Sequence, residues 1–338
     1  MVLDSEKRKG FNTEFNKEKH TTILKKVQFW SVVFVVIGFP SMLAFNTFYA
    51  YPQALDKYLW STKEYSKDKD EFGGLLSYPQ PTDSAEEANK KRNLREKAIT
   101  FIDDRYGNKL EVFRLFHENY PDQEKNKNYP LVIYLPGSSG VEGATAKTMF
   151  DAGFDVVTYN YPGFGNSSGN PDYQNFIHSS ETILDYVRKK YNVEPADIAI
   201  FSASLGTVAA FHLAQTYTFG SIVLVNPVDS AFNRCMDNLN KTYVVTCLTP
   251  QFLTEFNNIQ AAKTVKPNTF YQVSSNRDQI FPLKNQYEVF TNINNNSEKN
   301  LFTVNGGHNG SDSKQSEEIT RFIAKNYELK KQRESKKI

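Results

Sequence analysis

A serine, an aspartate and a histidine that lie far apart along the chain have the residue types needed for nucleophilic catalysis. Ser204 is flanked by small residues, Asp278 is followed by Gln-Ile-Phe-Pro, and His308 follows two glycines. A hydroxyl is a poor nucleophile until a base takes its proton and a carboxylate orients that base. The three residues therefore predict acyl transfer, in which Ser204 attacks, His308 is the base and Asp278 holds the imidazole.

The residues around Ser204 predict a strand, a sharp turn and a helix. Ile198–Phe201 is a short apolar run typical of a strand that is buried on both faces, and Thr207–Ala214 has helical composition. Such a turn can hold its central residue in a strained backbone conformation and raise the hydroxyl above the sheet. The competing interpretation is a serine in an ordinary strand–helix turn, because this short pattern also occurs by chance.

Acyl transfer also requires hydrogen-bond donors for the oxyanion that develops during the reaction. We expect one donor to be the backbone N–H of Leu205, the residue after the nucleophile. The second is expected in the loop after a strand at Leu131–Leu135, where the N–H of Ser138 is preferred and that of Gly137 is the alternative. A plain glycine turn is the competing interpretation of this loop. A further turn, Tyr161–Gly169, is expected to shape the pocket.

An alternation of strands and helices is predicted to position these residues. The predicted strands are Leu131–Leu135, Asp155–Tyr159, Ile198–Phe201, Ile222–Asn226, Thr269–Val273 and Leu301–Val304, preceded by a hairpin of Ile99–Ile102 with Leu110–Phe116. The predicted helices are Gly143–Ala152, Tyr173–Lys190, Thr207–Ala214 and Ser316–Tyr327. This alternation predicts an α/β fold with a mainly parallel sheet and helices on both faces. Ser204, Asp278 and His308 each follow a strand, at the edge of the sheet where ligands bind.

Four stretches make the chain resemble the α/β-hydrolase family from about Ala98 to Tyr327. They are Tyr159-Asn-Tyr-Pro-Gly-Phe-Gly-Asn-Ser-Ser-Gly169, Ser202-Ala-Ser-Leu-Gly206, Asp278-Gln-Ile-Phe-Pro282 and Gly307-His308. The chain is most similar to membrane-associated ABHD-type serine hydrolases without a large lid domain. The resemblance implies hydrolysis of acyl esters or thioesters, including lysophospholipids, monoacylglycerols and palmitoylated proteins. It implies no metal and no organic cofactor.

The chain departs from the family pattern at three places around the expected site. Pro136 stands where the family usually has histidine, Ser202 replaces the first glycine of the serine turn, and Ser274–Arg277 replaces a glycine-containing approach to the acid. None of these changes removes Ser204, His308 or Asp278. They motivate an alternative from another class, a catalytically idle accessory subunit of a membrane protein complex, for example in the mitochondrial inner membrane.

An uncharged segment near the N-terminus predicts a membrane anchor. Val27–Leu55 contains no charged residue, and Phe29–Phe45 within it is strongly apolar. The uncharged segment is long enough for a helix to cross the hydrocarbon core of a bilayer. A signal peptide and a buried soluble helix are the alternatives. Seven Lys and Arg residues precede the segment, so we expect the N-terminus on the cytosolic or matrix side. The large domain is then on the opposite side, in an endomembrane lumen or the mitochondrial intermembrane space.

Composition gives no reason to expect a nucleic-acid partner, because 40 basic and 38 acidic residues leave a net charge of only +2. The two cysteines, Cys235 and Cys247, are too few for a zinc site or a disulfide scaffold. The sequence does not decide whether they form one disulfide with each other. The predicted organisation is a polar basic tail (1–26), a transmembrane helix (27–51), a juxtamembrane connector with a surface helix at Ser84–Glu96 (52–97), the hydrolase domain (98–328) and a charged tail (329–338). Within that domain, 229–265 is predicted to be a short lid-like insertion. Its apolar residues either form a small flap over the pocket or pack into the hydrophobic core.

Overall fold

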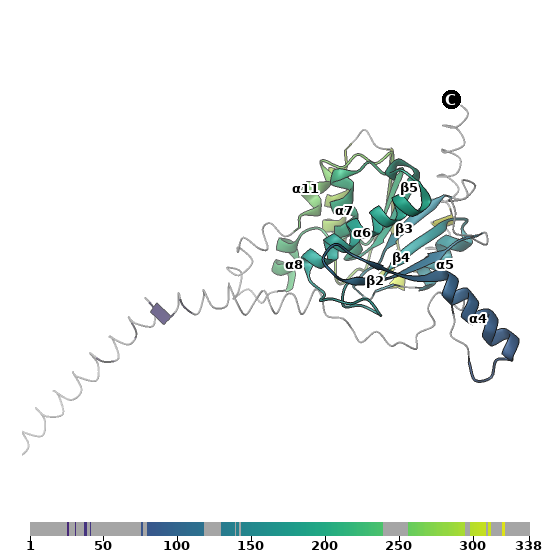
Figure 1. Cartoon of the computed structure of the whole chain (residues 1–338). Coiled ribbons are helices and arrows are strands. Elements are labelled where there is room, and N and C mark those ends of the chain that lie inside the picture. Colours follow the sequence, from purple (N-terminus) through teal and green to yellow (C-terminus); the bar gives the residue numbers. More distant parts are fainter. Residues whose placement is uncertain are drawn as a thin grey trace, which may run out of the picture. The chain divides into compact units, whose positions relative to one another are not determined.

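The computed structural model describes residues 80–117, 130–138, 140–141, 143–238, 256–294, 298–308, 310–311 and 320–321, together with Lys26, Ser31, Ile37, Gly38, Ser41 and Leu76. The chain divides into two compact units, Met1–Leu55 and Asp56–Ile338. Eight of the described strands of the second unit form one large sheet (Figure 1), and β9 (Gly306–Gly307) pairs with β10 (Gly310–Ser311) in a separate two-stranded ribbon.

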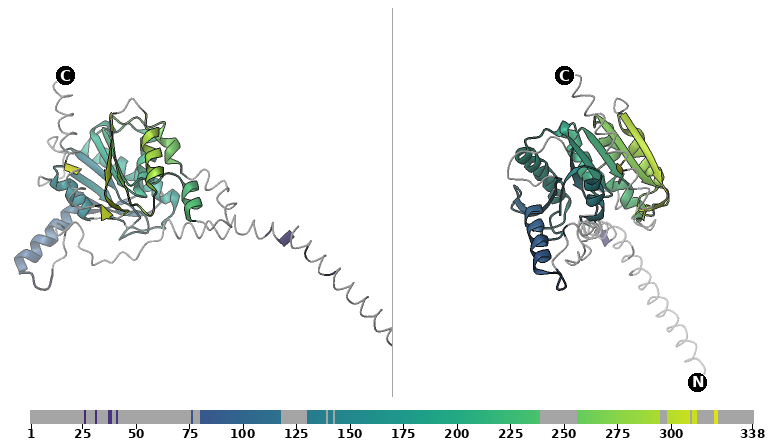
Figure 2. Two further views of the ribbon diagram at one scale, coloured as in Figure 1. Left: turned by 180° about the vertical axis from the view of Figure 1, so that it is seen from behind. Right: turned by 90° about the vertical axis from the view of Figure 1, so that its right-hand side faces the viewer.

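Eight strands form this central sheet. They are β1 (Ile99–Asp103), β2 (Lys109–Leu115), β3 (Leu131–Leu135), β4 (Asp155–Tyr159), β5 (Ile198–Ala203), β6 (Ser221–Val225), β7 (Thr269–Ser275) and β8 (Glu298–Val304). Their order is β1-β2-β4-β3-β5-β6-β7-β8, with β8, yellow in Figure 2, at one edge. β2 pairs antiparallel with β1 and β4, and all other neighbours are parallel. The mainly parallel sheet and the leading hairpin predicted from the sequence are confirmed.

The strands are apolar because both faces of the sheet are covered. Every residue of β3 and of β4 is buried, as are the first five residues of β5. Parallel strands covered on both faces show this continuous apolar composition rather than an alternation. The same composition aligns the strand ends: Ala203 lies opposite Val225, and Val225 lies opposite Val273. β5 and β6 therefore end at one level of the sheet, and β7 extends two residues further, to Ser275, toward the same edge.

The described helices are α4 (Ala85–Ala98), α5 (Gly143–Asp151), α6 (Tyr173–Tyr191), α7 (Gly206–Thr216), α8 (Ala231–Asn238), α11 (Asn258–Ala262) and α12 (Leu283–Asn292), with a 3-10 turn at Pro195–Asp197. α7 packs against β3, β5 and β6 and contacts α6 and α11, whereas α5 packs against β4 (Figure 1). α4 is the predicted surface helix, and Ser84 and Glu87 cap it reciprocally. The sequence analysis did not predict α12, which follows the turn that carries Asp278.

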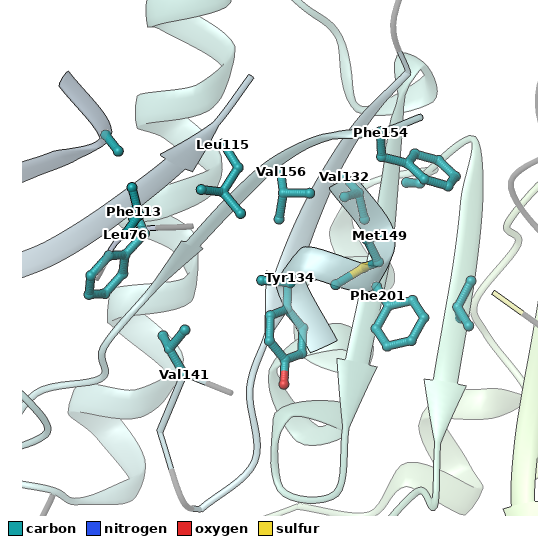
Figure 3. Close-up of a cluster of buried hydrophobic side chains, with 14 of the residues drawn as sticks. Leu76, Phe113, Leu115, Val132, Tyr134, Val141, Met149, Phe154, Val156 and Phe201 are labelled. Atoms are coloured by element: carbon teal, nitrogen blue, oxygen red, sulfur yellow. The ribbon is translucent and has the colours of Figure 1, made fainter. Parts of the chain in front are cut away.

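A cluster of apolar side chains fills the face of the sheet that α5 covers (Figure 3). Met149 of α5 belongs to it, with Val132 and Tyr134 of β3 and Phe201 of β5. The rings of Tyr134 and Phe201 meet edge to face at 6.0 Å. Burying one such side chain stabilises the fold by roughly 1.5–3 kcal/mol, so this cluster fixes the strands whose ends carry the site.

Three predictions lie largely or wholly outside the described residues. They are the membrane anchor at 27–51, the closing helix at Ser316–Tyr327, of which only 320–321 are described, and the middle of the insertion at 239–255. The described residues contain no helix with the length and apolar character of a membrane span. The side chains of Cys235 and Cys247 are not among the described groups, so their pairing stays a prediction.

Candidate active site

Ser204 occupies a strained turn between β5 and α7. Its φ of 51° lies in the left-handed region, which a residue other than glycine seldom adopts. The serine N–H donates to the carbonyl of Val225, and its carbonyl accepts from the N–H and the hydroxyl of Thr207 at 3.0 and 2.7 Å. A Cβ atom at Gly206 would lie 2.2 Å from the carbonyl oxygen of Leu135, so only glycine fits there. The predicted strand–turn–helix and its strained centre are confirmed.

The structure brings Ser204, His308 and Asp278 together as a continuous hydrogen-bonded chain. Nε2 of His308 lies 2.9 Å from Oγ of Ser204, and Nδ1 lies 2.8 Å from Oδ2 of Asp278. Since a carboxylate only accepts, the proton between them belongs to Nδ1, and Nε2 is left to accept from the serine hydroxyl. The side chain of His308 is 8% exposed and that of Asp278 is 0% exposed, so the aspartate is shielded from water and the imidazole nearly so.

Four donors fix the carboxylate of Asp278. The N–H groups of Ile280 and Phe281 each donate to Oδ1 at 2.8 Å. Oδ2 accepts from His308 and also from Nε2 of Gln286 at 3.1 Å. Gln286 is fully buried in α12 and also donates to the carbonyl of Phe281 at 2.7 Å. Gln286 was not predicted from the sequence, because α12 was not predicted either, and no local pattern links Gln286 to Asp278 in the turn before that helix.

The ring of Phe281, in the loop that carries Asp278 (the acid loop), packs against the imidazole of His308. Arg234 packs on the same ring. Phe281 meets the ring of His308 edge to face, with centroids 4.8 Å apart and planes at 76°. The guanidinium of Arg234 lies over Phe281 at 4.6 Å and donates to the carbonyl of Ile280. Arg234 belongs to α8, which opens the predicted lid-like insertion. The described start of that insertion therefore packs against the acid loop.

The loop predicted to stabilise an oxyanion lies beside Ser204. Gly137 is buried, and a Cβ atom placed on it would lie 3.3 Å from Cβ and 3.8 Å from Oγ of Ser204, whereas Ser138 is exposed. The phenol of Tyr161 donates to the carbonyl of Pro136 at 3.0 Å, and burial raises the pKa of Tyr161 well above its usual value. The phenol therefore keeps its proton and holds the start of this loop. Leu205 is buried at the first turn of α7.

The turn at Tyr161–Gly169 is tied to the sheet by a buried carboxylate. Glu111 of β2 accepts from the side chain of Asn160 at 2.9 Å and from the N–H and the side chain of Asn166 at 3.0 and 2.7 Å. The side-chain oxygen of Asn160 in turn accepts from the N–H of Val141 at 3.4 Å. This turn therefore braces the loop after β3. The sequence analysis did not identify Glu111, because its partners lie 49 and 55 residues away.

One of the three departures from the family pattern is accommodated without disturbing the turn at Ser204. Ser202 is fully buried, and its hydroxyl donates to the carbonyl of Val223 on β6 at 3.4 Å. The extra oxygen is therefore directed into the neighbouring strand. Ser202 is thus compatible with a functional serine turn.

The other described histidines have partners away from Ser204. His117 pairs with Asp155 at 3.3 Å, and His212 of α7 pairs with Glu181 of α6 at 2.8 Å. His178 stacks on Tyr106 with centroids 4.0 Å apart. Within the described part of the chain, no group of three or more His, Cys, Asp or Glu side chains is arranged to hold a metal ion.

Sequence comparisons agree with this architecture. Residues 130–246 match the family model described as alpha/beta hydrolase fold. Human alpha/beta hydrolase domain-containing protein 17B is 30% identical over 89 residues, which are 26% of this chain and 31% of that protein. Protein 17C of Xenopus tropicalis is 32% identical over 89 residues, which are 26% of this chain and 29% of that protein. The match thus spans about a third of the length of these relatives.

Structural comparisons give the same fold at low sequence identity. Acetyl xylan esterase from Paenibacillus sp. R4 superposes with a TM-score of 0.53 at 14% identity, covering 74% of this chain and 98% of that chain. An esterase from Pyrococcus furiosus superposes with a TM-score of 0.51 at 17% identity, covering 67% and 90%. Sheet order, family model and solved structures agree on the α/β-hydrolase fold, and over 89 residues the chain is similar to alpha/beta hydrolase domain-containing proteins of the ABHD type.

Proposed function

We propose that the chain is a membrane-anchored serine hydrolase that cleaves acyl esters or thioesters of lipids or lipidated proteins. The α/β-hydrolase fold, shared with esterases, supports a hydrolase. The observation that carries the proposal is the unbroken hydrogen-bonded chain from Ser204 through His308 to Asp278. This arrangement supplies the three groups that acyl transfer by a serine requires.

In the proposed mechanism, Nε2 of His308 takes the proton of Ser204 as Oγ attacks the acyl carbonyl carbon. The oxyanion accepts hydrogen bonds from the N–H of Leu205 and from that of Ser138 or Gly137. Collapse of the tetrahedral adduct breaks the bond to the alcohol or thiol, which leaves with the proton from His308. Water then gives a proton to His308 and attacks the acyl-serine. Collapse of this second adduct breaks the acyl–Oγ bond, His308 returns the proton to Oγ of Ser204, and the acid is released. Asp278 holds the imidazole in one tautomer throughout.

Membrane anchoring and the acyl substrate rest on the apolar segment at 27–51 and on the ABHD resemblance. An anchored enzyme meets acyl chains at the bilayer surface, where lipids and lipidated proteins present their ester and thioester bonds. The basic residues before the segment favour a cytosolic or matrix N-terminus, with the hydrolase domain on the opposite side of the membrane.

The alternative is a catalytically idle accessory subunit held by other subunits of a membrane complex. The altered residues Pro136, Ser202 and Ser274 motivated it. The assembled Ser204–His308–Asp278 chain and the buried, hydrogen-bonded hydroxyl of Ser202 favour the enzyme.

The test is labelling of the full-length, detergent-solubilised protein by a fluorophosphonate probe, with Ser204→Ala as the control. We expect labelling of the wild-type protein only, hydrolysis of long-chain p-nitrophenyl esters, and a loss of turnover on the order of 10⁴-fold or more in Ser204→Ala. A folded wild-type protein that neither reacts with the probe nor hydrolyses esters, and that purifies in a stoichiometric complex, would select the idle subunit.

A further inference from the structure

An asparagine outside the Ser204–His308–Asp278 set joins the loops that carry these three residues. Asn226 is the first residue after β6 and is 4% exposed. Its Nδ2 donates to the carbonyl oxygen of His308 at 2.9 Å, and its Oδ1 accepts from the N–H of Ser275 at 2.8 Å. Ser275 ends β7, three residues before Asp278. A single amide thus connects the backbone of the base to the strand that leads to the acid.

The same position is also linked to the nucleophile. The N–H of Ser204 donates to the carbonyl of Val225 at 2.9 Å, and the N–H of Asn226 donates to the carbonyl of Val273 at 2.8 Å. The end of β6 therefore contacts the strand–helix turn of the serine, the strand before the acid and the loop of the histidine. In the described structure these contacts converge on two consecutive residues.

The backbone of Asn226 is held in an uncommon conformation to make these contacts. Its φ of 46° lies in the left-handed region, where glycine is unstrained and asparagine is tolerated. Glycine would satisfy the backbone and would lose only the side chain. Residues held in such conformations cluster where function requires them.

The histidine loop needs a fixed contact of this kind because two glycines lead into it. Backbone pairing from the β7 side is described as far as Gly306, whose carbonyl accepts from the N–H of Arg277 at 2.9 Å. Gly307 follows and pairs with Gly310, so His308 lies in the turn of a short two-stranded ribbon. The amide of Asn226 contacts the carbonyl of His308 itself, within this turn and beyond Gly306, where the pairing with the β7 side ends.

We propose that Asn226 is a positioning residue that sets the distance between the imidazole of His308 and its two partners. The inference rests on the proposed function, since it assigns Asn226 a role in the same reaction. Asn226 touches no reacting atom and acts through the main chain of His308. Its loss leaves the imidazole free to withdraw from Ser204, and a displacement near 1 Å can cost about 100-fold in rate.

The test compares Asn226→Gly and Asn226→Asp with the wild-type, full-length protein. Asn226→Gly keeps the backbone conformation and removes the amide. Asn226→Asp keeps the shape of the side chain and the oxygen that accepts from Ser275. It replaces the amide nitrogen by an oxygen, which would face the carbonyl oxygen of His308 and repel it. Asn192→Gly is the matched control, because Asn192 at the end of α6 has a φ of 48° and no described contact with the site.

Two readouts distinguish positioning from a general structural role. One is the split between kcat and KM in ester hydrolysis, recorded with the thermal unfolding midpoint. The other is the downfield proton signal of the His308 Nδ1–H in the NMR spectrum, assigned by its loss in His308→Gln. This signal reports the bond to Asp278 and does not depend on turnover.

We expect both Asn226 variants to lose about 10- to 100-fold in kcat at nearly unchanged KM, and to lose or shift the Nδ1–H signal. Asn226→Gly should fold and should unfold somewhat below the wild-type temperature, because the carbonyl of His308 and the N–H of Ser275 lose a buried partner. Asn192→Gly should match the wild type in every readout. The inference is overturned if Asn226→Gly keeps the wild-type signal, whatever its activity. A wild-type protein that shows the signal but no turnover contradicts the proposed function instead, and the signal in the variants still decides the role of Asn226.

Discussion

Gln286 Nε2 donates to Asp278 Oδ2 at 3.1 Å, the same carboxylate oxygen that accepts Nδ1 of His308. Both Gln286 and Asp278 have buried side chains, and the glutamine also donates to the carbonyl of Phe281 within the acid loop. Gln286 therefore holds the carboxylate of Asp278 in two ways: it donates directly to Oδ2, and it donates to the backbone of the loop that carries the aspartate. Three donors besides His308 hold the carboxylate of Asp278, so the imidazole meets it in a single orientation.

We expect Gln286→Leu to lower kcat by about tenfold or more with little change in KM, because the carboxylate loses one of its two donors on Oδ2. Gln286→Glu should lose more, since it opposes a second carboxylate to Asp278. Gln215→Leu makes the same exchange at an exposed position in the last turn of α7, at the end of that helix remote from Ser204, and serves as the control. Steady-state kinetics with the unfolding midpoint give the measurement, and equal losses in Gln286→Leu and Gln215→Leu would contradict this role for Gln286.

Gly206→Ala should abolish probe labelling of Ser204 and destabilise the fold by about 1–3 kcal/mol. The new methyl group would lie 2.2 Å from the carbonyl oxygen of Leu135 and 2.6 Å from that of Pro136. Backbone oxygens cannot move aside as a flexible side chain does, so the serine turn must shift.

Gly107→Ala is the control that separates the steric clash at Gly206 from the general cost of replacing a glycine. Gly107 has a φ of 85° with open space around it, so the variant strains the backbone far from Ser204. It should lose some stability and keep its labelling rate per folded molecule. The prediction for Gly206 is wrong if Gly206→Ala labels at the wild-type rate.

Glu111→Leu should destabilise the protein by on the order of 3 kcal/mol or more, because it removes the acceptor of three hydrogen bonds in a site where the glutamate is 2% exposed. Glu111→Gln keeps the shape and one of the two oxygens, so we expect a smaller loss. Urea unfolding of both variants measures the difference. Similar midpoints for Glu111→Leu and Glu111→Gln would show that these bonds do not hold the turn at Tyr161–Gly169.

Folding stability should fall as the pH decreases below about 6.5, in part because of His178. Burial of its ring, which stacks on Tyr106, lowers the pKa of His178 below the ordinary value of 6.5. The unfolded chain then binds the proton more readily than the folded protein, so acid favours unfolding. His178→Phe keeps a stacked ring without a titrating group, and it should lose less stability between pH 7.5 and 5.5. Equal losses in the variant and the wild type, from urea midpoints at both pH values, would refute this.

The strand order along the chain and the three site residues could be predicted because their signals are local. β3 and β4 were predicted with the bounds that the structure gives them, since a strand covered on both faces is apolar at every position. Ser204 was identified by the small residues that a sharp turn requires. Asp278 and His308 were found because parallel strands end at one edge of the sheet, so the residues after them meet there.

The contacts that hold this site in place depended on the tertiary structure. Asn226 reaches His308 across 82 residues of sequence, and Glu111 reaches Asn166 across 55. An asparagine after a strand or a glutamate within one has no local pattern that reveals such a partner. The chain thus determined by itself which chemical groups reach the edge of the sheet, because that follows from local periodicity. The distances between these groups, and the hydrogen bonds that hold them in place, depend on the tertiary structure. Hydrogen bonds between distant segments form only once the sheet has brought those segments together.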